Sequence, residues 1–577
     1  MDESDFADVI DALPAELAVW HDGPAALPRL LATCVLQRVR AEVDLLSFGI
    51  KPGMGEDGSG MEDPRYSQHR HRWRHAVSAV IQWHARCGHP SESLVPPSLK
   101  QRGSSNRAGR RRGRQHARNL TARDYEVAAD LASTWFELDP IRVGCRTGDI
   151  KITKATPRHV WVENRRRAEI EVLDLVLEGV TVPVPNREER PDRPDPITEW
   201  FLSRSLAPAG SRDLPRRHPA AFSLLNSLPE TIRARAWIET EDDLRIRGAT
   251  VPGTIDLGGL TFEQARACYA FLISQLRLNQ IGAFHFGVPE ALLWAVRPGN
   301  LEIGLSSRVD PSAARAFIDM CTFVAGRSPI SAPLIPSGDF LYVPAEIVSP
   351  VAYERTLLRA AAARPAAAGT LGNILGNRAR RWAERLRTIP DCEVAEGLVV
   401  KDSTGRQLGD LDVVAWDAET RFMAIFETKW PVDAATLSES NKVDALFDKG
   451  GEQLQRLRSA IDQGAAVAWP ESWNVPAAKA TSWWVGSAQQ LDSRPDWDAP
   501  GIQTTSLRMI EQLLPANGLR DLIDRLTTFP LPRRGQDYDL VEHTVSAGAL
   551  TIHYNALSLR DGPPVPPPER RLQMGWT

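Results

Sequence analysis

The sequence predicts a multidomain protein with a mostly α-helical N-terminal region, an α+β middle domain and a C-terminal α/β domain. Length is the first observation, because 577 residues exceed the roughly 250 to 300 residues that one hydrophobic core usually serves. The second is periodicity, which changes from helical spacing of apolar residues to strand-like alternation near the C-terminus. Stretches rich in Pro, Gly and charge are the third, because they separate these regions.

The N-terminal region, residues 1–195, is expected to be mostly helical because apolar residues recur at helical spacing in 27–46 and 75–87. Within it, residues 101–118 contain seven arginines and no acidic residue. That composition predicts a flexible loop able to contact phosphate groups, although a solvated loop in an arginine-rich protein is the alternative. Residues 182–196 have the composition of an interdomain linker.

The middle domain is expected at residues 197–358, with a regulatory or recognition role. A helical stretch at 261–278 there is combined with strand-like runs such as 339–348, which is typical of an α+β domain. The C-terminal α/β domain is expected at 366–560, and a Pro-rich tail at 561–577 follows it.

Composition excludes several classes of protein. Net charge is −4, so any binding to nucleic acid must come from local patches. No apolar run approaches the roughly 18 residues that span a bilayer, and the acidic N-terminus lacks a secretory signal, so we expect a cytoplasmic protein without a membrane partner. Glycine-rich phosphate loops are absent from the sequence, which argues against a nucleotide-hydrolysing or dinucleotide-binding domain.

Charged residues interrupt two strand-like runs in the C-terminal domain, at 408–416 and 421–430. Period-2 alternation puts Asp410 and Asp412 on one face of the first strand, and Glu427 with Lys429 on one face of the second. Neighbouring carboxylates raise each other's pKa, and a divalent cation relieves that repulsion. Carboxylate oxygens together with waters and substrate phosphate are what Mg²⁺ prefers, so the pattern indicates phosphodiester hydrolysis.

The sequence GDLDVV followed by IFETKW resembles the PD-(D/E)xK nuclease superfamily. The resemblance implies a restriction-endonuclease-like α/β domain with a mixed central sheet flanked by helices. In it, Asp412 and Glu427 would hold Mg²⁺ or Mn²⁺, with the Thr428 carbonyl as a further ligand. Lys429 would position the attacking water. The chain has only nine lysines, which gives a lysine at this position more weight. Asp410 is the substitute candidate for Asp412.

Two flanking helices also fit the resemblance. A helix over 373–389 carries Glu384, which would be a further acidic group of the site or a solvated helical glutamate. A helix over 449–461 carries Gln453, with Gln455 as the second candidate for the glutamine of several branches of the superfamily. The tyrosine that some branches carry after that glutamine is absent, so assignment to the RecB-like branch is not supported.

The expected function is therefore a metal-dependent DNA nuclease, acting as a bacterial defence effector against phage or plasmids, with DNA as substrate and protein partners bound through the other domains. A DNA-repair or recombination nuclease is one alternative, and a non-cleaving binding module on a nuclease fold is another. A third interpretation is structural: an edge hairpin decorated with surface salt bridges, which is the usual role of charges on strands.

Overall fold

A computed structural model of the chain describes its fold. The described residues are 2–20, 26–47, 64–87, 120–181, 197, 200, 228–247, 251–286, 292–348, 350, 353–364, 379–429, 437–473, 475, 480–488, 491–494, 500–547 and 550–559. The chain forms two compact units, each assembled from separate stretches of sequence. Unit 1 comprises Met1–Ala7, Pro140–Val182 and Leu371–Thr577, and unit 2 comprises Asp8–Asp139 and Pro183–Thr370.

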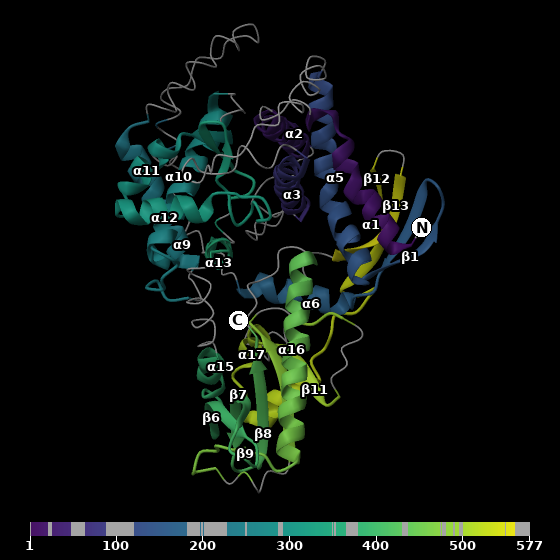
Figure 1. Cartoon of the computed structure of the whole chain (residues 1–577), viewed down its shortest axis with the longest axis vertical. Coiled ribbons are helices and arrows are strands. Elements are labelled where there is room, and N and C mark those ends of the chain that lie inside the picture. Colours follow the sequence, from purple (N-terminus) through teal and green to yellow (C-terminus); the bar gives the residue numbers. More distant parts are fainter. Residues whose placement is uncertain are drawn as a thin grey trace. The chain divides into compact units, whose positions relative to one another are not determined.

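Unit 2 is mainly helical (Figure 1). It also carries a small antiparallel sheet of strand order β3-β5-β4. Its core joins Val35, Ala236 and Leu278, which come from the N-terminal and the middle parts of the sequence. The elements are α1 (Glu3–Ala12) and α5 (Ala122–Thr147), both shared with unit 1, η1 (Leu13–Glu16), α2 (Ala26–Ser47), α3 (Pro64–Cys87), α9 (Glu230–Arg247), α10 (Phe262–Phe286), β3 (Leu293–Val296), α11 (Pro298–Ser306), α12 (Pro311–Cys321), β4 (Ile335–Ser337), β5 (Phe340–Pro344) and α13 (Tyr353–Ala362).

Unit 1 contains two sheets and the candidate site. Its elements are β1 (Ile150–Ala155), β2 (His159–Asn164), α6 (Ala168–Thr181), α15 (Ala379–Leu386), β6 (Cys392–Lys401), β7 (Gln407–Asp417), β8 (Phe422–Thr428), α16 (Leu437–Asp462), β9 (Ala466–Val467), β10 (Ala480–Ser487), β11 (Ile502–Ser506), α17 (Leu507–Leu513), α18 (Leu519–Thr527), β12 (Tyr538–Ala547) and β13 (Leu550–Leu559).

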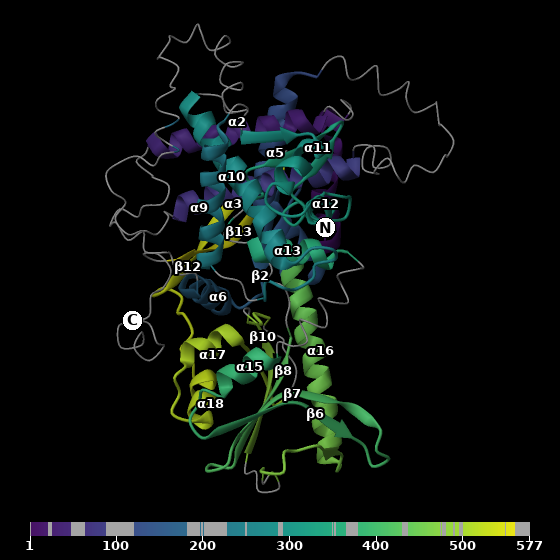
Figure 2. The same ribbon diagram turned by 90° about the vertical axis from the view of Figure 1, so that its left-hand side faces the viewer.

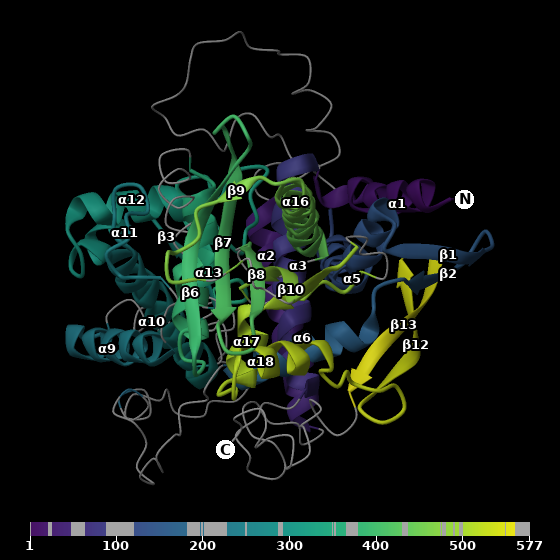
Figure 3. The same cartoon turned by 90° about the horizontal axis from the view of Figure 1, so that it is seen from below.

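The larger sheet of unit 1 is mixed, with strand order β11-β10-β8-β7-β6-β9. Strand β7 runs antiparallel to β6 and β8, whereas β8, β10 and β11 are mutually parallel. Helix α16 covers one face, and α15, α17 and α18 cover the other (Figures 2 and 3). Strand β8 is apolar at every position from 422 to 426, as expected for a strand buried on both faces.

The smaller sheet of unit 1 joins distant parts of the sequence (Figure 1). Its strand order is β1-β2-β13-β12, and β2 pairs in parallel with β13. Val160 and Ile552 are fully buried on its inner face. Helix α6, which follows β2, adds Leu173 and Leu177 to the core that covers the α15 side of the larger sheet. Residues 140–182 therefore belong structurally with the C-terminal region.

The expected mixed α/β character and multidomain organisation are confirmed. The unit boundaries differ from the expected ones, because the chain does not divide into three consecutive regions. The helices expected at 261–278 and 373–389 correspond to α10 and α15, and the strands of the expected hairpin correspond to β7 and β8. Residues 1–195 do not form a separate helical region, because Asp8–Asp139 groups with the middle region while Met1–Ala7 and Pro140–Val182 group with the C-terminal part. Strands β1 and β2 within this region are an addition to the expectation.

Residues 101–118 and 561–577, expected as an arginine-rich loop and a Pro-rich tail, lie outside the described residues. In the described part of the chain, no helix combines the length and the apolar character needed to cross a membrane.

Candidate active site

Strands β7 and β8 bring the first two candidate residues together. Their register runs from Asp417 opposite Phe422 to Val413 opposite Phe426, so that one step further Asp412 lies level with Glu427. At this point Asp412 Oδ2 accepts hydrogen bonds from the backbone N–H of Thr428 at 2.7 Å and from the Thr428 hydroxyl at 3.0 Å. The Asp412 carboxylate is therefore held in place by the end of β8.

Gly397 lies across from Asp412 on β6 and has a φ of +64°. The side chains of β7 change face at this point, since Val413 packs on the α15 side of the sheet while Leu411 packs on the α16 side. A residue in the left-handed region interrupts regular alternation, as in a β-bulge, and such irregularities re-aim neighbouring side chains. Strict alternation, from which Asp410 and Asp412 were expected on one face, does not hold here.

Glu427 is the centre of a buried polar cluster. Its side chain is only 1% exposed, and its two oxygens contact two different groups. Lys429 Nζ lies 2.5 Å from Glu427 Oε1, and Gln453 Nε2 donates to Glu427 Oε2 at 3.0 Å. Lys429 Nζ also donates to Gln453 Oε1 at 3.4 Å, which closes a ring of three side chains.

Helix α16 approaches the strands closely enough for Gln453 to reach Glu427. A Cβ atom at Gly450 would lie 2.7 Å from Val485 Cγ1 and 3.3 Å from Lys429 Cε, so only glycine fits at this contact. The backbone N–H of Lys429 donates to the carbonyl of Gly486 on β10 at 2.6 Å. The position of Lys429 is therefore set by both α16 and β10.

Both carboxyl groups of the cluster are perturbed in the same direction. Burial, reinforced by the nearby Asp412 carboxylate, raises the pKa of Glu427 to about 7 even though Lys429 opposes the shift. Burial also raises the pKa of Asp412, against the effect of the hydrogen bonds from Thr428. Asp410 contributes to both shifts as a nearby negative charge. The two carboxyl groups therefore resist joint ionisation unless a cation joins them.

The remaining candidate residues, Glu384 and Gln455, form no hydrogen bond with this cluster among the contacts found in the described residues. Glu384 lies on the exposed side of α15, where its carboxylate forms an ion pair with Arg380 at 3.4 Å, and the structure does not bring it into the cluster. Gln455 is two residues from Gln453, so the two side chains leave α16 in different directions. Of the two glutamines, the structure joins Gln453 to Glu427.

The interpretation of this hairpin as an exposed edge is wrong. Both β7 and β8 are interior strands of the six-stranded sheet, with neighbours on each side. The ion pair of Glu427 with Lys429 involves side chains that are only 1% and 20% exposed, so it is not a surface salt bridge.

The donor set fits a hard divalent cation. Among the described residues, no group of three or more His, Cys, Asp and Glu side chains is arranged to hold a metal ion. Mg²⁺ nevertheless commonly binds through one or two carboxylates, with water and substrate phosphate completing its octahedron. Asp412 and Glu427 supply such a pair, and the pKa of each is raised by burial and by neighbouring carboxylates, an effect that a bound cation would offset.

Three residues that support the cluster were not identified from the sequence in these roles. The Thr428 side chain holds Asp412, which no local pattern indicates. Gly397 and Gly450 are glycines inside a strand and a helix. An interior glycine in either element is a known sign of a bulge or a close packing contact, so a signal for these two existed.

Comparison of the chain with protein-family models, with curated proteins and with solved structures gave no significant match.

Proposed function

We propose that unit 1 is a metal-dependent nuclease that hydrolyses phosphodiester bonds in DNA at Asp412, Glu427, Lys429 and Gln453. One observation supports this most strongly: the buried Glu427 carboxyl group and the half-buried Asp412 carboxyl group, both with raised pKa values, lie on neighbouring interior strands, and Glu427 contacts the Lys429 ammonium group. Burying such groups together lowers stability, and perturbed titratable groups concentrate at functional sites. The neighbouring Lys429 supplies an ammonium group that can orient the attacking water or offset the negative charge that develops on the phosphate.

Each side chain has a distinct role in this proposal. Asp412 and Glu427 hold the cation, with the Thr428 carbonyl as a further ligand. Mg²⁺ or Mn²⁺ bound there would act as a Lewis acid on a phosphate oxygen and lower the pKa of a bound water. Lys429, whose side chain is partly exposed, donates to the attacking water or to the phosphate. Gln453 keeps the Glu427 carboxylate oriented through its bond to Oε2.

Incubation of the full chain with supercoiled, linear and single-stranded DNA tests the proposal. We expect cleavage with Mg²⁺ or Mn²⁺, and none in excess EDTA. Ca²⁺ should support binding with little turnover, because its coordination is longer and looser. Undiminished cleavage in EDTA would exclude the metal mechanism. Binding without products on every DNA form would favour a non-cleaving module.

A further inference from the structure

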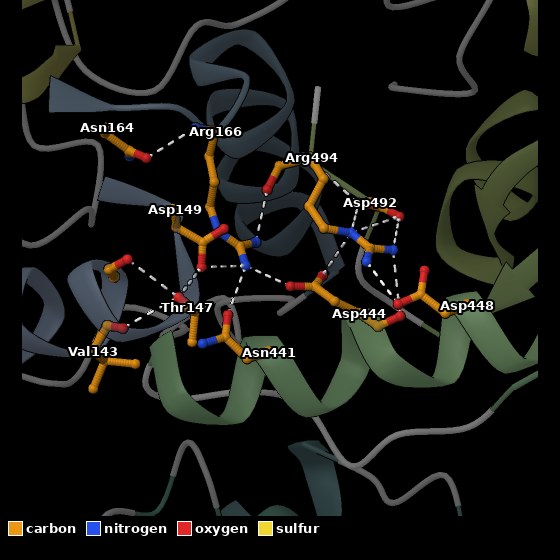
Figure 4. A network of polar contacts seen from close by, with 12 residues as sticks. Val143, Thr147, Asp149, Asn164, Arg166, Asn441, Asp444, Asp448, Asp492 and Arg494 are labelled. Atoms are coloured by element: carbon orange, nitrogen blue, oxygen red, sulfur yellow. Dashed lines mark hydrogen bonds and ion pairs between the residues drawn. The ribbon is translucent and has the colours of Figure 1, made fainter. Parts of the chain in front are cut away.

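A buried polar network fastens α16 to the segment that contains β2 and α6 (Figure 4). Arg166, in the short connection between β2 and α6, is its centre, with a side chain only 5% exposed. Its Nη2 lies 2.5 Å from Asp444 Oδ2 and donates to Asn441 Oδ1 at 2.8 Å, and both partners are on α16. On its other sides, Arg166 pairs with Asp149 at 3.3 Å and donates to Ser493 Oγ at 3.0 Å.

A second arginine extends the network along the same side of α16. Arg494 Nη1 donates to Asp448 Oδ2 at 2.9 Å, and its Nη2 donates to the carbonyl of Asp444 at 3.3 Å. Arg494 also forms a short pair with the buried Asp492, with Nη2 and Oδ2 2.6 Å apart. Residues 491–494 thus lie as a strap against α16.

Backbone contacts tie this strap to the N-terminal segment as well. The backbone N–H of Arg167 donates to the carbonyl of Ser493 at 2.7 Å. The backbone N–H of Leu491 donates to the Asp174 carboxylate of α6, at 3.1 Å from Oδ2. Both side-chain and backbone bonds therefore connect residues 149–174, the strap and α16 within unit 1.

The network and the candidate site lie on opposite sides of α16. Figure 4 shows Asn441, Asp444 and Asp448 extending from one side of the helix toward the two arginines. Gln453 follows Asp444 by nine residues, which is about two and a half helical turns and therefore places it on the opposite side, about 13 Å further along the axis. Between the two sides, Val443, Phe447, Leu454 and Leu457 form the apolar stripe that packs on the sheet.

An apolar stripe alone permits small rotations of a helix about its axis, because dispersion contacts are not directional. Hydrogen-bonded ion pairs on one side restrict that rotation, since they demand particular distances and angles. Any rotation of α16 displaces Gln453, and with it the bonds from Gln453 to Glu427 and Lys429.

We propose that Arg166 is a positioning residue for the candidate site, acting by fixing the rotation of α16 and hence the place of Gln453. This inference rests on the proposed function for its catalytic consequence. It makes residues 140–182 a functional part of the nuclease unit. Loss of the Arg166 side chain leaves Asp444 buried and deprived of its closest cationic partner, a change that strongly perturbs a buried pair.

The test compares Arg166→Met with Arg387→Met in the full chain. Arg387 is the matched control, because it also pairs with a carboxylate of unit 1, Glu396 at 2.7 Å, but is exposed and distant from α16 in the sequence. Native-state hydrogen exchange is followed for residues 449–456 of α16 and for α18. We expect at least tenfold faster exchange in 449–456 for Arg166→Met, unchanged exchange in α18, and no change at either place for Arg387→Met.

Kinetics add a second measurement. With Mg²⁺ and DNA, Arg166→Met should lower kcat by at least tenfold and change KM by less than threefold, because the site is misaligned while substrate contacts remain. If hydrogen exchange became faster by the same factor in α18 and in 449–456, Arg166 would have a purely structural role and the inference would be overturned. An exchange rate in 449–456 equal to that of the parent protein would also overturn it. Absence of cleavage by the parent chain would refute the proposed function, and the exchange result would still decide the role of Arg166.

Should Arg166→Met fail to fold, Arg166→Lys decides the matter, because it keeps the charge and loses the fork that reaches Asp444 and Ser493 together. The same selective acceleration in 449–456 is expected. A hydrogen-exchange rate in 449–456 of Arg166→Lys equal to that of the parent protein would overturn the inference.

Discussion

A carboxyl group on an interior strand, such as Glu427, raises the free energy of the folded state whenever it is ionised. Its folded pKa of about 7 lies above its ordinary value of 4.5. In metal-free protein, the folded state therefore holds the proton more tightly than the unfolded state. The contribution of Glu427 to stability is fully present below about pH 4.5 and is lost as pH rises through about 7.

Glu427→Gln removes this titration while keeping the shape of the side chain. In EDTA at pH 8 we expect the variant to be more stable than the parent, by up to about 3 kcal/mol, because one pKa unit corresponds to about 1.4 kcal/mol. At pH 5 the difference should largely disappear. Thermal unfolding at both pH values measures it, with the exposed Glu452→Gln on α16 as the control. A difference that grew toward acid pH would contradict this assignment.

Lys429→Met separates the role of the ammonium group from metal ligation. We expect cleavage to fall by at least about a hundredfold, because the group that orients the water or the phosphate is lost. Mg²⁺ should still raise the unfolding temperature, more than it does for Glu427→Gln, since lysine is not a ligand. Lys449→Met, at an exposed position of α16, is the matched control and should cleave at the parental rate. Parental activity in both variants would remove Lys429 from the site.

At the scale of elements, Gly450 determines how closely α16 approaches β8 and β10. Gly450→Ala should destabilise unit 1 by about 1 to 3 kcal/mol, because the added methyl overlaps Val485 at 2.7 Å. Cleavage should fall as well, since Lys429 Cε is the next contact. The control is Gly299→Ala in α11, where no atom lies within 4 Å and helix propensity favours alanine by up to about 1 kcal/mol. Equal effects of the two changes would contradict the close contact.

The β7–β8 hairpin could be predicted because its signals are local. Alternation with period 2 and a polar turn lie within about twenty residues, and they located Asp412 and Glu427 correctly on two paired strands, with Lys429 directly after the second strand. The prediction that side chains alternate strictly between the two faces is wrong at Asp412, because the alternation is interrupted where Gly397 lies on the neighbouring strand. That effect depends on strand pairing, which a single-strand pattern does not contain.

At the scale of the molecule, the sequence did not reveal that unit 1 is assembled from distant stretches. Arg166 and Asp444 are 278 residues apart, and His159 of β2 meets His553 of β13 across 394 residues. Strands β1 and β2 are six residues each, and β2 obtains its parallel partner, β13, from the other end of the chain. The periodicity of a short segment carries no information about pairings between distant residues. Residues 140–182 were therefore assigned to a helical region.

Because unit 1 is assembled from separate stretches of sequence, we expect the C-terminal region to be less stable on its own. Residues 366–560 produced without 140–182 should unfold at a lower temperature than unit 1 in the full chain, because Asp444 loses Arg166 and β13 loses β2. A buried charge without its partner typically costs about 3 to 5 kcal/mol. Co-production of 140–182 should restore the transition, as followed by circular dichroism. An unchanged unfolding temperature of the fragment would contradict the assembly of unit 1 from separate stretches of sequence.

The most direct test of the site is the initial rate of Mg²⁺-dependent DNA cleavage by Glu427→Gln compared with Glu452→Gln. Both changes remove one carboxylate, but only Glu427 belongs to the cluster with Asp412 and Lys429. Our account predicts a fall of at least about a hundredfold for Glu427→Gln and a parental rate for Glu452→Gln. Equal cleavage by parent and both variants would contradict it.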